Sequence, residues 1–177
     1  DYQRETTPFN PVSPYGCAKV FGYNICRNYR NSYGLHIVNG ILFNHESPRR
    51  APQFLLQKIA TSAVDIKRNK QSQLSLGNLS AKCDWGFAGD FVEAMHKIVQ
   101  QKEPGDYVVC TAVQHSIREL LTTAFRTAGI DDWEQYVESD PRYKRPAEVF
   151  ALHGSYAKAK EKLGWEPKTE FKDMISF

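Results

Sequence analysis

The chain has 177 residues, of which 41% are hydrophobic and 24% are charged, and its formal net charge is +3. This is the composition of a soluble globular domain, and the charge is too small to indicate a nucleic-acid partner. No apolar run approaches the roughly 18 residues that a membrane-spanning helix needs, and the first residues lack the apolar segment of a signal peptide. The four cysteines have no C-x-x-C spacing, which indicates neither a zinc site nor a disulfide framework. We therefore expect a cytoplasmic protein with no metal and no membrane partner.

The first predicted elements are a helix and a buried strand. Ser13 is a favoured N-cap, apolar residues then recur at helical spacing over residues 14–33, and Gly34 suits the position after a helix end. Leu35–Phe43 is a near-continuous apolar run, which is typical of a parallel strand buried on both faces.

The middle of the chain alternates loops with regular elements. A loop is expected over residues 44–53, a helix over Phe54–Asn69 and a short strand over Leu74–Gly77. A second loop over residues 78–86 leads into a helix from about residue 90 to residue 101.

The last part predicts one more buried strand and two helices. Tyr107–Ala112 is the strand, and an S-x-x-E capping box at Ser116 begins a helix that ends near Ala128. Ser155 is expected to cap a short final helix that Gly164 ends. Strands that alternate with helices in this way indicate the α/β class.

The stretch SPYGCAK places Tyr15 and Lys19 four residues apart, on one face of the first helix. An isolated Y-x-x-x-K pattern is most often a packed aromatic beside a solvated lysine. The functional alternative is an activated tyrosine, because a neighbouring positive charge stabilises a phenolate that can act as a general base.

Polar residues follow the first buried strand in the stretch NHESPRR. Active sites of open α/β sheets lie beyond the carboxyl ends of the strands. The candidates by position are therefore Asn44, His45, Glu46, Arg49 and Arg50. Two adjacent arginines in a loop are often only solvated, but at this place they suit phosphate binding.

Several stretches together resemble the C-terminal half of the GDP-mannose 4,6-dehydratases, which are extended short-chain dehydrogenases/reductases. The matching stretches occur in the family's order and cover nearly the whole chain: ETTPF, SPYGCAK, VNGILFNHESPRR, LGNLSAKCDWG, RPAEV and KAKEKLGWEP. The resemblance implies the C-terminal part of a Rossmann-type parallel sheet plus a smaller substrate-binding α/β domain. It assigns residues 1–50 to the remainder of the NADP-binding domain and 51–177 mainly to the nucleotide-sugar region, with about 87–112 returning to the Rossmann sheet.

The resemblance also implies an activity. A family member oxidises C4 of GDP-mannose with NADP, eliminates water between C5 and C6, and returns the hydride to C6, which yields GDP-4-keto-6-deoxymannose. Tyr15 would take the proton of the sugar's 4-hydroxyl, and Lys19 would assist it and hold the nicotinamide ribose. His45 and Arg50 would contact NADP.

The substrate contacts implied by the resemblance are Asn44, Lys58 and Arg145. From the residues alone, Lys58 is equally well the polar face of a helix, and Arg145 is a surface charge. Asp84 and Trp85 are interpreted as structural, and the remaining histidines as ordinary. Family members assemble as dimers or tetramers, so a homo-oligomer is expected.

The chain departs from the family pattern at several places. It contains no G-x-x-G-x-x-G phosphate-binding turn, and the family's catalytic threonine and glutamate precede the stretch matched by residue 1. We expect a fragment, which is inactive alone, because the sequence begins within a motif. Cys83 occupies the position of a family arginine that is expected to hold the substrate diphosphate. The alternatives are a related epimerase or 4-keto reductase, and an inactive truncated paralogue with a binding role.

Overall fold

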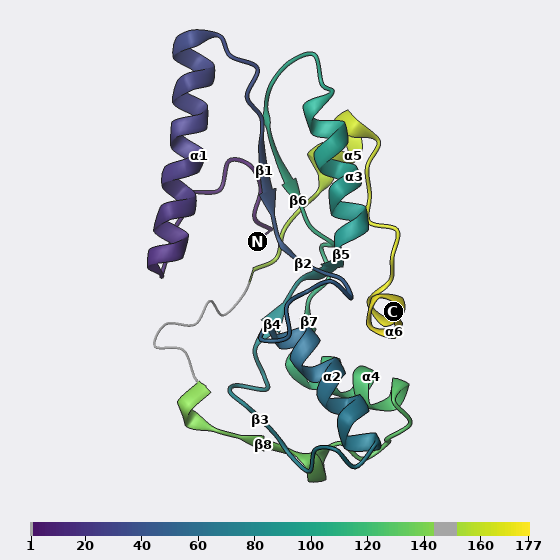
Figure 1. The fold of residues 1–177 in the computed structure, drawn as a ribbon. Helices are drawn as coiled ribbons and strands as arrows, with labels where there is room; N and C mark the ends of the chain where they lie inside the picture. Colours follow the sequence, from purple (N-terminus) through teal and green to yellow (C-terminus); the bar gives the residue numbers. More distant parts are fainter. Residues whose placement is uncertain (1, 144–151) are drawn as a thin grey trace.

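The computed structural model describes residues 2–143 and 152–177. Two groups of helices and strands lie one above the other in Figure 1, and the β1–β2 segment passes from the upper group to the lower one. The predicted α/β class is confirmed. Among the described residues, three of the four strand pairs are parallel, and helices alternate with short groups of strands along the chain.

The upper group is built on β1 (Asn39–Leu42) and β6 (Asp106–Val109), which pair in parallel. The helix α1 (Pro14–Tyr33) lies on one side of this pair, and α3 (Ala88–Val99) and α5 (Ala157–Leu163) lie on the other (Figure 1).

The ends of α1 are those that the sequence predicts. The hydroxyl of Ser13 accepts a hydrogen bond from the backbone N–H of Gly16 at 3.0 Å, and Gly34 closes the helix at a φ of 63°. Its apolar side chains are exposed, however, and no residue of α1 is buried: Tyr15 is 72% exposed and Phe21 68%. The helix therefore does not pack an apolar face into a core.

The strand predicted over residues 35–43 is shorter and less buried than expected. Only residues 39–42 form β1, and they are half-buried or exposed. In the part of the chain that the structure describes, β1 pairs with β6 alone, and α1 brings no buried side chain over it. β6 fits its prediction, since Val108 and Val109 are 1% and 0% exposed.

A small core joins α3, β6 and the segment around α5. Phe91 and Ala94 of α3 are fully buried with Val109 and Trp165. The indole N–H of Trp165 donates to the carbonyl of Asp90 at 2.9 Å, so the tryptophan is held at the start of α3. The proposed domain boundaries stay a prediction.

The lower group contains three short strand pairs and three helices. β2 (Asn44–Glu46) pairs in parallel with β5 (Trp85–Phe87), β3 (Leu74–Leu76) in parallel with β8 (Val137–Ser139), and β4 (Lys82–Cys83) antiparallel with β7 (His115–Ser116). The helices are α2 (Leu55–Lys67), α4 (Ile117–Thr127) and α6 (Phe171–Ser176), and two 3-10 turns follow at Glu134–Tyr136 and Pro141–Tyr143.

The larger core lies in this lower group. Ile59 of α2 and Leu120, Leu121 and Phe125 of α4 are fully buried, and Trp133 is 3% exposed. The capping box at Ser116 is present as predicted and begins α4.

Several predicted boundaries are wrong. The loops expected over residues 44–53 and 78–86 contain β2, β4 and β5. Strands of two or three residues are too short to show a period in sequence, and their partners lie far along the chain. Tyr156, not Ser155, is the N-cap of α5, and neither α6 nor β8 was predicted. Among the residues that the structure describes, no helix is long and apolar enough to cross a membrane.

Candidate active site

The start of α1 presents Tyr15 and Lys19 together. The ammonium of Lys19 lies 5.3 Å from the centre of the Tyr15 ring, as one helical turn predicts. The phenol is 72% exposed, and the lysine is exposed as well. Both side chains are therefore accessible to a ligand, and their catalytic and cofactor-binding roles stay predictions.

Asn44 and His45 lie on β2, beside Trp85 and Gly86 of β5. The Nδ1 of His45 lies 2.8 Å from the carbonyl oxygen of Phe43, so Nδ1 is the donor in this contact and Nε2 is the other ring nitrogen open to a ligand. The His45 ring stacks on Phe91 at a centroid distance of 4.9 Å. The histidine is thus oriented from two sides, whereas Asn44 is exposed.

Glu46 is a candidate by position, to which the family resemblance assigns no role. It is 5% exposed, and its Oε2 lies 3.2 Å from the Nε of Arg50. Burial raises the pKa of the Glu46 carboxyl, and the charges of Arg50 and His45 oppose that shift. The guanidinium also lies 3.6 Å from the centre of the Phe54 ring, so Arg50 is held between Glu46 and Phe54, and its two terminal nitrogens are donors that suit an anion. The sequence signal for this ion pair is an acidic residue four positions before an arginine.

Lys58 leaves α2 toward β3. Its ammonium donates to the carbonyl of Ser75 at 2.9 Å and lies 4.7 Å from the centre of the Tyr143 ring. One of its three N–H groups is therefore engaged by a carbonyl of the described residues. Arg145, the third predicted substrate contact, lies outside the described residues.

The antiparallel β4–β7 pair places Cys83 opposite His115 and Lys82 opposite Ser116, the N-cap of α4. The ring of His115 also stacks on Phe171, with ring centroids 3.8 Å apart. Its interpretation as a histidine without a functional role stays a prediction. Burial lowers the pKa of His115, which favours a neutral imidazole near Cys83.

Asp84 is structural, as expected. It is fully buried, and its carboxylate accepts hydrogen bonds from the backbone N–H groups of Thr111 and Ala112 and from the Thr111 hydroxyl at 2.7 to 3.1 Å. These bonds tie the β4–β5 segment to the residues that follow β6.

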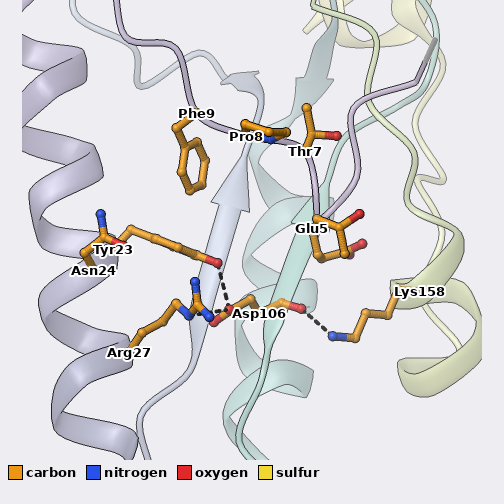
Figure 2. A pocket seen from close by; sticks show the side chains of 10 residues that line it. Glu5, Thr7, Pro8, Phe9, Tyr23, Asn24, Arg27, Asp106 and Lys158 are labelled. Carbon is orange, nitrogen blue, oxygen red and sulfur yellow. Dashed lines mark hydrogen bonds and ion pairs between the residues drawn. The ribbon is translucent and has the colours of Figure 1, made fainter.

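A pocket of about 520 Å³ lies away from these residues. Figure 2 shows it between the N-terminal segment and α1, with Phe9, Tyr23, Arg27, Asp106 and Lys158 around it. None of the predicted site residues lines it.

The predicted residues form two sets. Tyr15 and Lys19 lie at the start of α1, while Asn44, His45, Arg50 and Lys58 lie on or near β2 and α2. In Figure 1 the start of α1 and the carboxyl end of β1, which leads into β2, are at the same end of the upper group. This is the end at which α/β sheets hold their ligands.

Comparison with known proteins decides the family. The family described as GDP-mannose 4,6 dehydratase matches residues 1–176. The chain belongs to this family. GDP-mannose 4,6 dehydratase 1 of Arabidopsis thaliana is 50% identical over 173 residues, which are 98% of this chain and 48% of that protein. The chain thus spans about half the length of the curated relatives that it matches.

Solved structures show the same fold. The structure described as RMD from Pseudomonas aeruginosa complexed with NADPH matches 99% of this chain and 57% of its own, with a TM-score of 0.88 and 21% identity. The UDP-glucose 4-epimerase of Thermus thermophilus in complex with NAD matches 99% of this chain and 56% of its own, with a TM-score of 0.84 and 27% identity. The extended short-chain dehydrogenase/reductase fold of this family is therefore confirmed.

Proposed function

We propose that this chain is the part of a GDP-mannose 4,6-dehydratase that carries the tyrosine–lysine pair and most of the nucleotide-sugar contacts. The reaction is the conversion of GDP-mannose to GDP-4-keto-6-deoxymannose. The observation that carries the proposal is the 50% identity to the Arabidopsis dehydratase over 98% of the chain. The exposed Tyr15–Lys19 pair at the start of α1 supports it.

A nicotinamide cofactor, and specifically NADP, belongs to this proposal. Two structures of the same fold hold NADPH and NAD respectively. The sugar and phosphate groups of such a molecule suit accessible Tyr15 and Lys19, the Nε2 of His45 and the terminal nitrogens of Arg50. The sequence lacks the glycine-rich turn that cradles a dinucleotide pyrophosphate, so these residues fit only part of it. When bound, NADP supplies a reversible hydride acceptor.

The roles of the chain's own groups follow from their chemistry. Tyr15 removes the proton of the sugar's 4-hydroxyl, and Lys19 stabilises the phenolate by its charge. Glu46 fixes Arg50 so that the guanidinium is already oriented when an anion arrives. Lys58 and Asn44, together with Arg145, hold the guanosine diphosphate.

The runner-up is a related nucleotide-sugar epimerase or 4-keto reductase. The 4-epimerase shares the fold at 27% identity, well below the 50% of the dehydratase, which favours dehydration. We also propose a cytoplasmic homo-oligomer. The thiols of Cys17, Cys26 and Cys110 form no disulfide, which supports a reducing compartment.

The experiment joins the first half of the Arabidopsis relative to residue 1 of this chain. The chimera and the 177-residue chain are each incubated with GDP-mannose and NADP⁺, and the 4-keto sugar is measured by mass spectrometry. We expect sustained product from the chimera and none from the chain alone. A folded chimera that binds GDP-mannose without forming product would overturn the dehydratase assignment. Turnover by the chain alone would overturn the half-site argument.

A further inference from the structure

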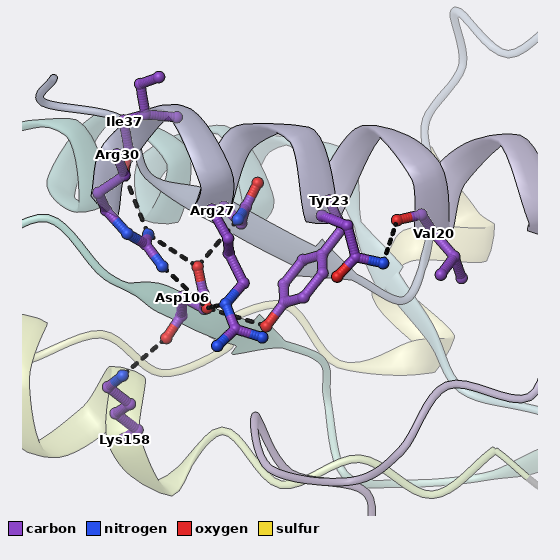
Figure 3. Close-up of polar contacts among 9 residues, drawn as sticks. Val20, Tyr23, Arg27, Arg30, Ile37, Asp106 and Lys158 are labelled. Carbon is purple, nitrogen blue, oxygen red and sulfur yellow. Dashed lines mark hydrogen bonds and ion pairs between the residues drawn. The ribbon is translucent and has the colours of Figure 1, made fainter. Parts of the chain in front are cut away.

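Asp106 is the residue on which the polar contacts of α1 converge. It opens β6, and its carboxylate accepts hydrogen bonds from the phenol of Tyr23 at 2.9 Å and the amide of Asn39 at 2.9 Å. The guanidinium of Arg30 donates to both carboxylate oxygens, at 2.9 and 3.2 Å (Figure 3). Arg27 adds a longer ion pair at 3.9 Å.

The three α1 residues in this cluster lie on one face of the helix. Tyr23, Arg27 and Arg30 are spaced at i, i+4 and i+7, which is the spacing of a single helical stripe. Lys19 lies one turn before Tyr23 on the same stripe. The face that contacts Asp106 thus continues to the lysine of the proposed site.

The rest of α1 gives the helix little other attachment. None of its residues is buried. Beyond Asp106, the described side-chain contacts that it makes with other parts of the chain include Arg30 to the carbonyl of Ile37 and the Tyr23 ring on Phe9, with centroids 4.7 Å apart. Because most of the stability of a helix in a protein comes from its tertiary contacts, the polar cluster has a large share in holding α1.

The burial of the cluster makes its contacts strong. The side chains of Asp106 and Arg30 are each 13% exposed, whereas that of Arg27 is 49% exposed. A bidentate arginine–carboxylate pair in such a place is well ordered, and removing one partner leaves the other without compensation. The carbonyl of Asp106 also accepts from Lys158 of α5 at 2.8 Å, so the residue is fixed on its other side.

We propose that Asp106 is a positioning residue that anchors α1 to the amino ends of β1 and β6 and thereby sets the place of Tyr15 and Lys19. The catalytic consequence rests on the proposed function, but the anchoring does not. Tyr15 precedes Tyr23 by eight residues, which is about 12 Å of helix. A helix held at Tyr23 and Arg30 carries its first turn to a defined position at the carboxyl end of the sheet.

The first test measures amide hydrogen exchange in the 177-residue chain. In Asp106→Asn we expect the exchange protection factors of α1 to fall about 10- to 100-fold, because hydrogen bonds to a charged group contribute free energy of that size. The protection factors of α3 and α4 should not change. Tyr23→Phe, which removes one bond, should give a smaller loss in α1 alone. The control is Glu93→Gln, which changes a half-buried carboxylate of α3 that pairs with Lys168 and should leave the protection of α1 unchanged. Unchanged α1 protection in Asp106→Asn would overturn the proposal, and so would an equal loss in α3.

The second test measures kinetics in the chimera with the Arabidopsis half. Asp106→Asn should lower kcat with little change in KM for GDP-mannose, and Asp106→Glu should restore part of kcat. An Asp106→Asn chimera with unchanged kcat would overturn the positioning role. A wild-type chimera without activity would instead count against the proposed function, and the exchange result would still decide whether Asp106 anchors α1.

Discussion

The helices α1 and α4 both carry large apolar side chains, but they use them differently. In α4, Leu120 and Phe125 are fully buried against α2. In α1, Phe21 is 68% exposed and no residue is buried. α4 is held by its apolar face and α1 by polar contacts to Asp106.

The residues that stabilise the fold and the tyrosine–lysine pair proposed to react therefore lie in different parts of the chain. The lower group contains the larger core, so its fold is stabilised by its own residues. α1 presents the residues proposed to react, and few apolar contacts fix it. Changes in the lower group should therefore act first on the free energy of unfolding, and changes at the start of α1 on turnover.

Tyr15→Phe in the chimera gives the largest expected effect. A general acid–base group typically supplies about 10²- to 10⁴-fold in rate, so kcat should fall by that factor. Binding of GDP-mannose and the melting temperature should hardly change, because the phenol is exposed. Tyr33→Phe, at an equally exposed place on the same helix, is the control. Wild-type kcat in Tyr15→Phe would mean that the tyrosine has no part in the chemistry.

Phe125→Ala and Phe21→Ala compare the two helices directly. Phe125 is fully buried, so its truncation should cost about 3–5 kcal/mol of unfolding free energy. The same change at exposed Phe21 should stay within about 0.5 kcal/mol. Urea unfolding of both variants measures the difference. Equal losses would show that α1 shares the core of the lower group.

Cys83→Arg restores the residue of the family pattern beside α4. Hydrogen bonds to charged groups contribute about 1.5–3 kcal/mol, so binding of GDP-mannose by the chimera should tighten roughly ten- to a hundredfold. NADP binding should change less. Calorimetric titration measures both, and Cys83→Lys tests charge without the bidentate geometry. Equal affinities would show that position 83 does not face the diphosphate or that Lys82 already compensates.

Titration of two aspartates gives the smallest effect. Burial alone would raise the pKa of Asp106, but hydrogen bonds from Arg30, Asn39 and Tyr23 outweigh it and leave this pKa below its ordinary value. Its contribution to stability is present above the unfolded pKa of about 3.9 and is lost as the pH falls through the folded value. Burial raises the pKa of Asp84. Its contribution is present below about pH 3.9 and is lost as the pH rises through the folded value.

Carboxyl-carbon NMR should therefore place the Asp106 midpoint below that of Asp84. Arg30 and Arg27 of α1 and Lys158 of α5 are the cations that face Asp106 or its carbonyl. Arg30→Met should raise the Asp106 midpoint and leave that of Asp84 unchanged. The reverse order of midpoints would contradict the polar anchor.

Local sequence signals predicted the parts of the fold that depend on local physics. The cap at Ser13, the stop at Gly34 and the capping box at Ser116 are formed by residues within four positions of one another. The exposure of the apolar face of α1 could not be predicted, because such a face in the sequence shows only that a helix is able to pack against a core. β2, β4 and β5 depend on partners between 32 and 41 residues away and are too short to show a period.

Local spacing in the sequence likewise predicted one part of the candidate site. Tyr15 and Lys19 meet because one helical turn brings them together. The pairing of Cys83 with His115 and the convergence of Tyr23, Arg30 and Asn39 on Asp106 join distant segments. The sequence signal for the convergence on Asp106 was an acidic residue at the start of a buried strand.

Calorimetric titration of the 177-residue chain with GDP tests most directly whether the lower group carries the nucleotide-sugar site. The account predicts that GDP binds and that Lys58→Met weakens binding about tenfold or more, the loss of a charged contact. Lys67→Met is the matched control, since Lys67 lies on the same helix and donates to the carbonyl of Gly129 at 2.8 Å, much as Lys58 donates to Ser75. Equal GDP affinity in the wild type, Lys58→Met and Lys67→Met, or no binding to the folded chain, would contradict the account.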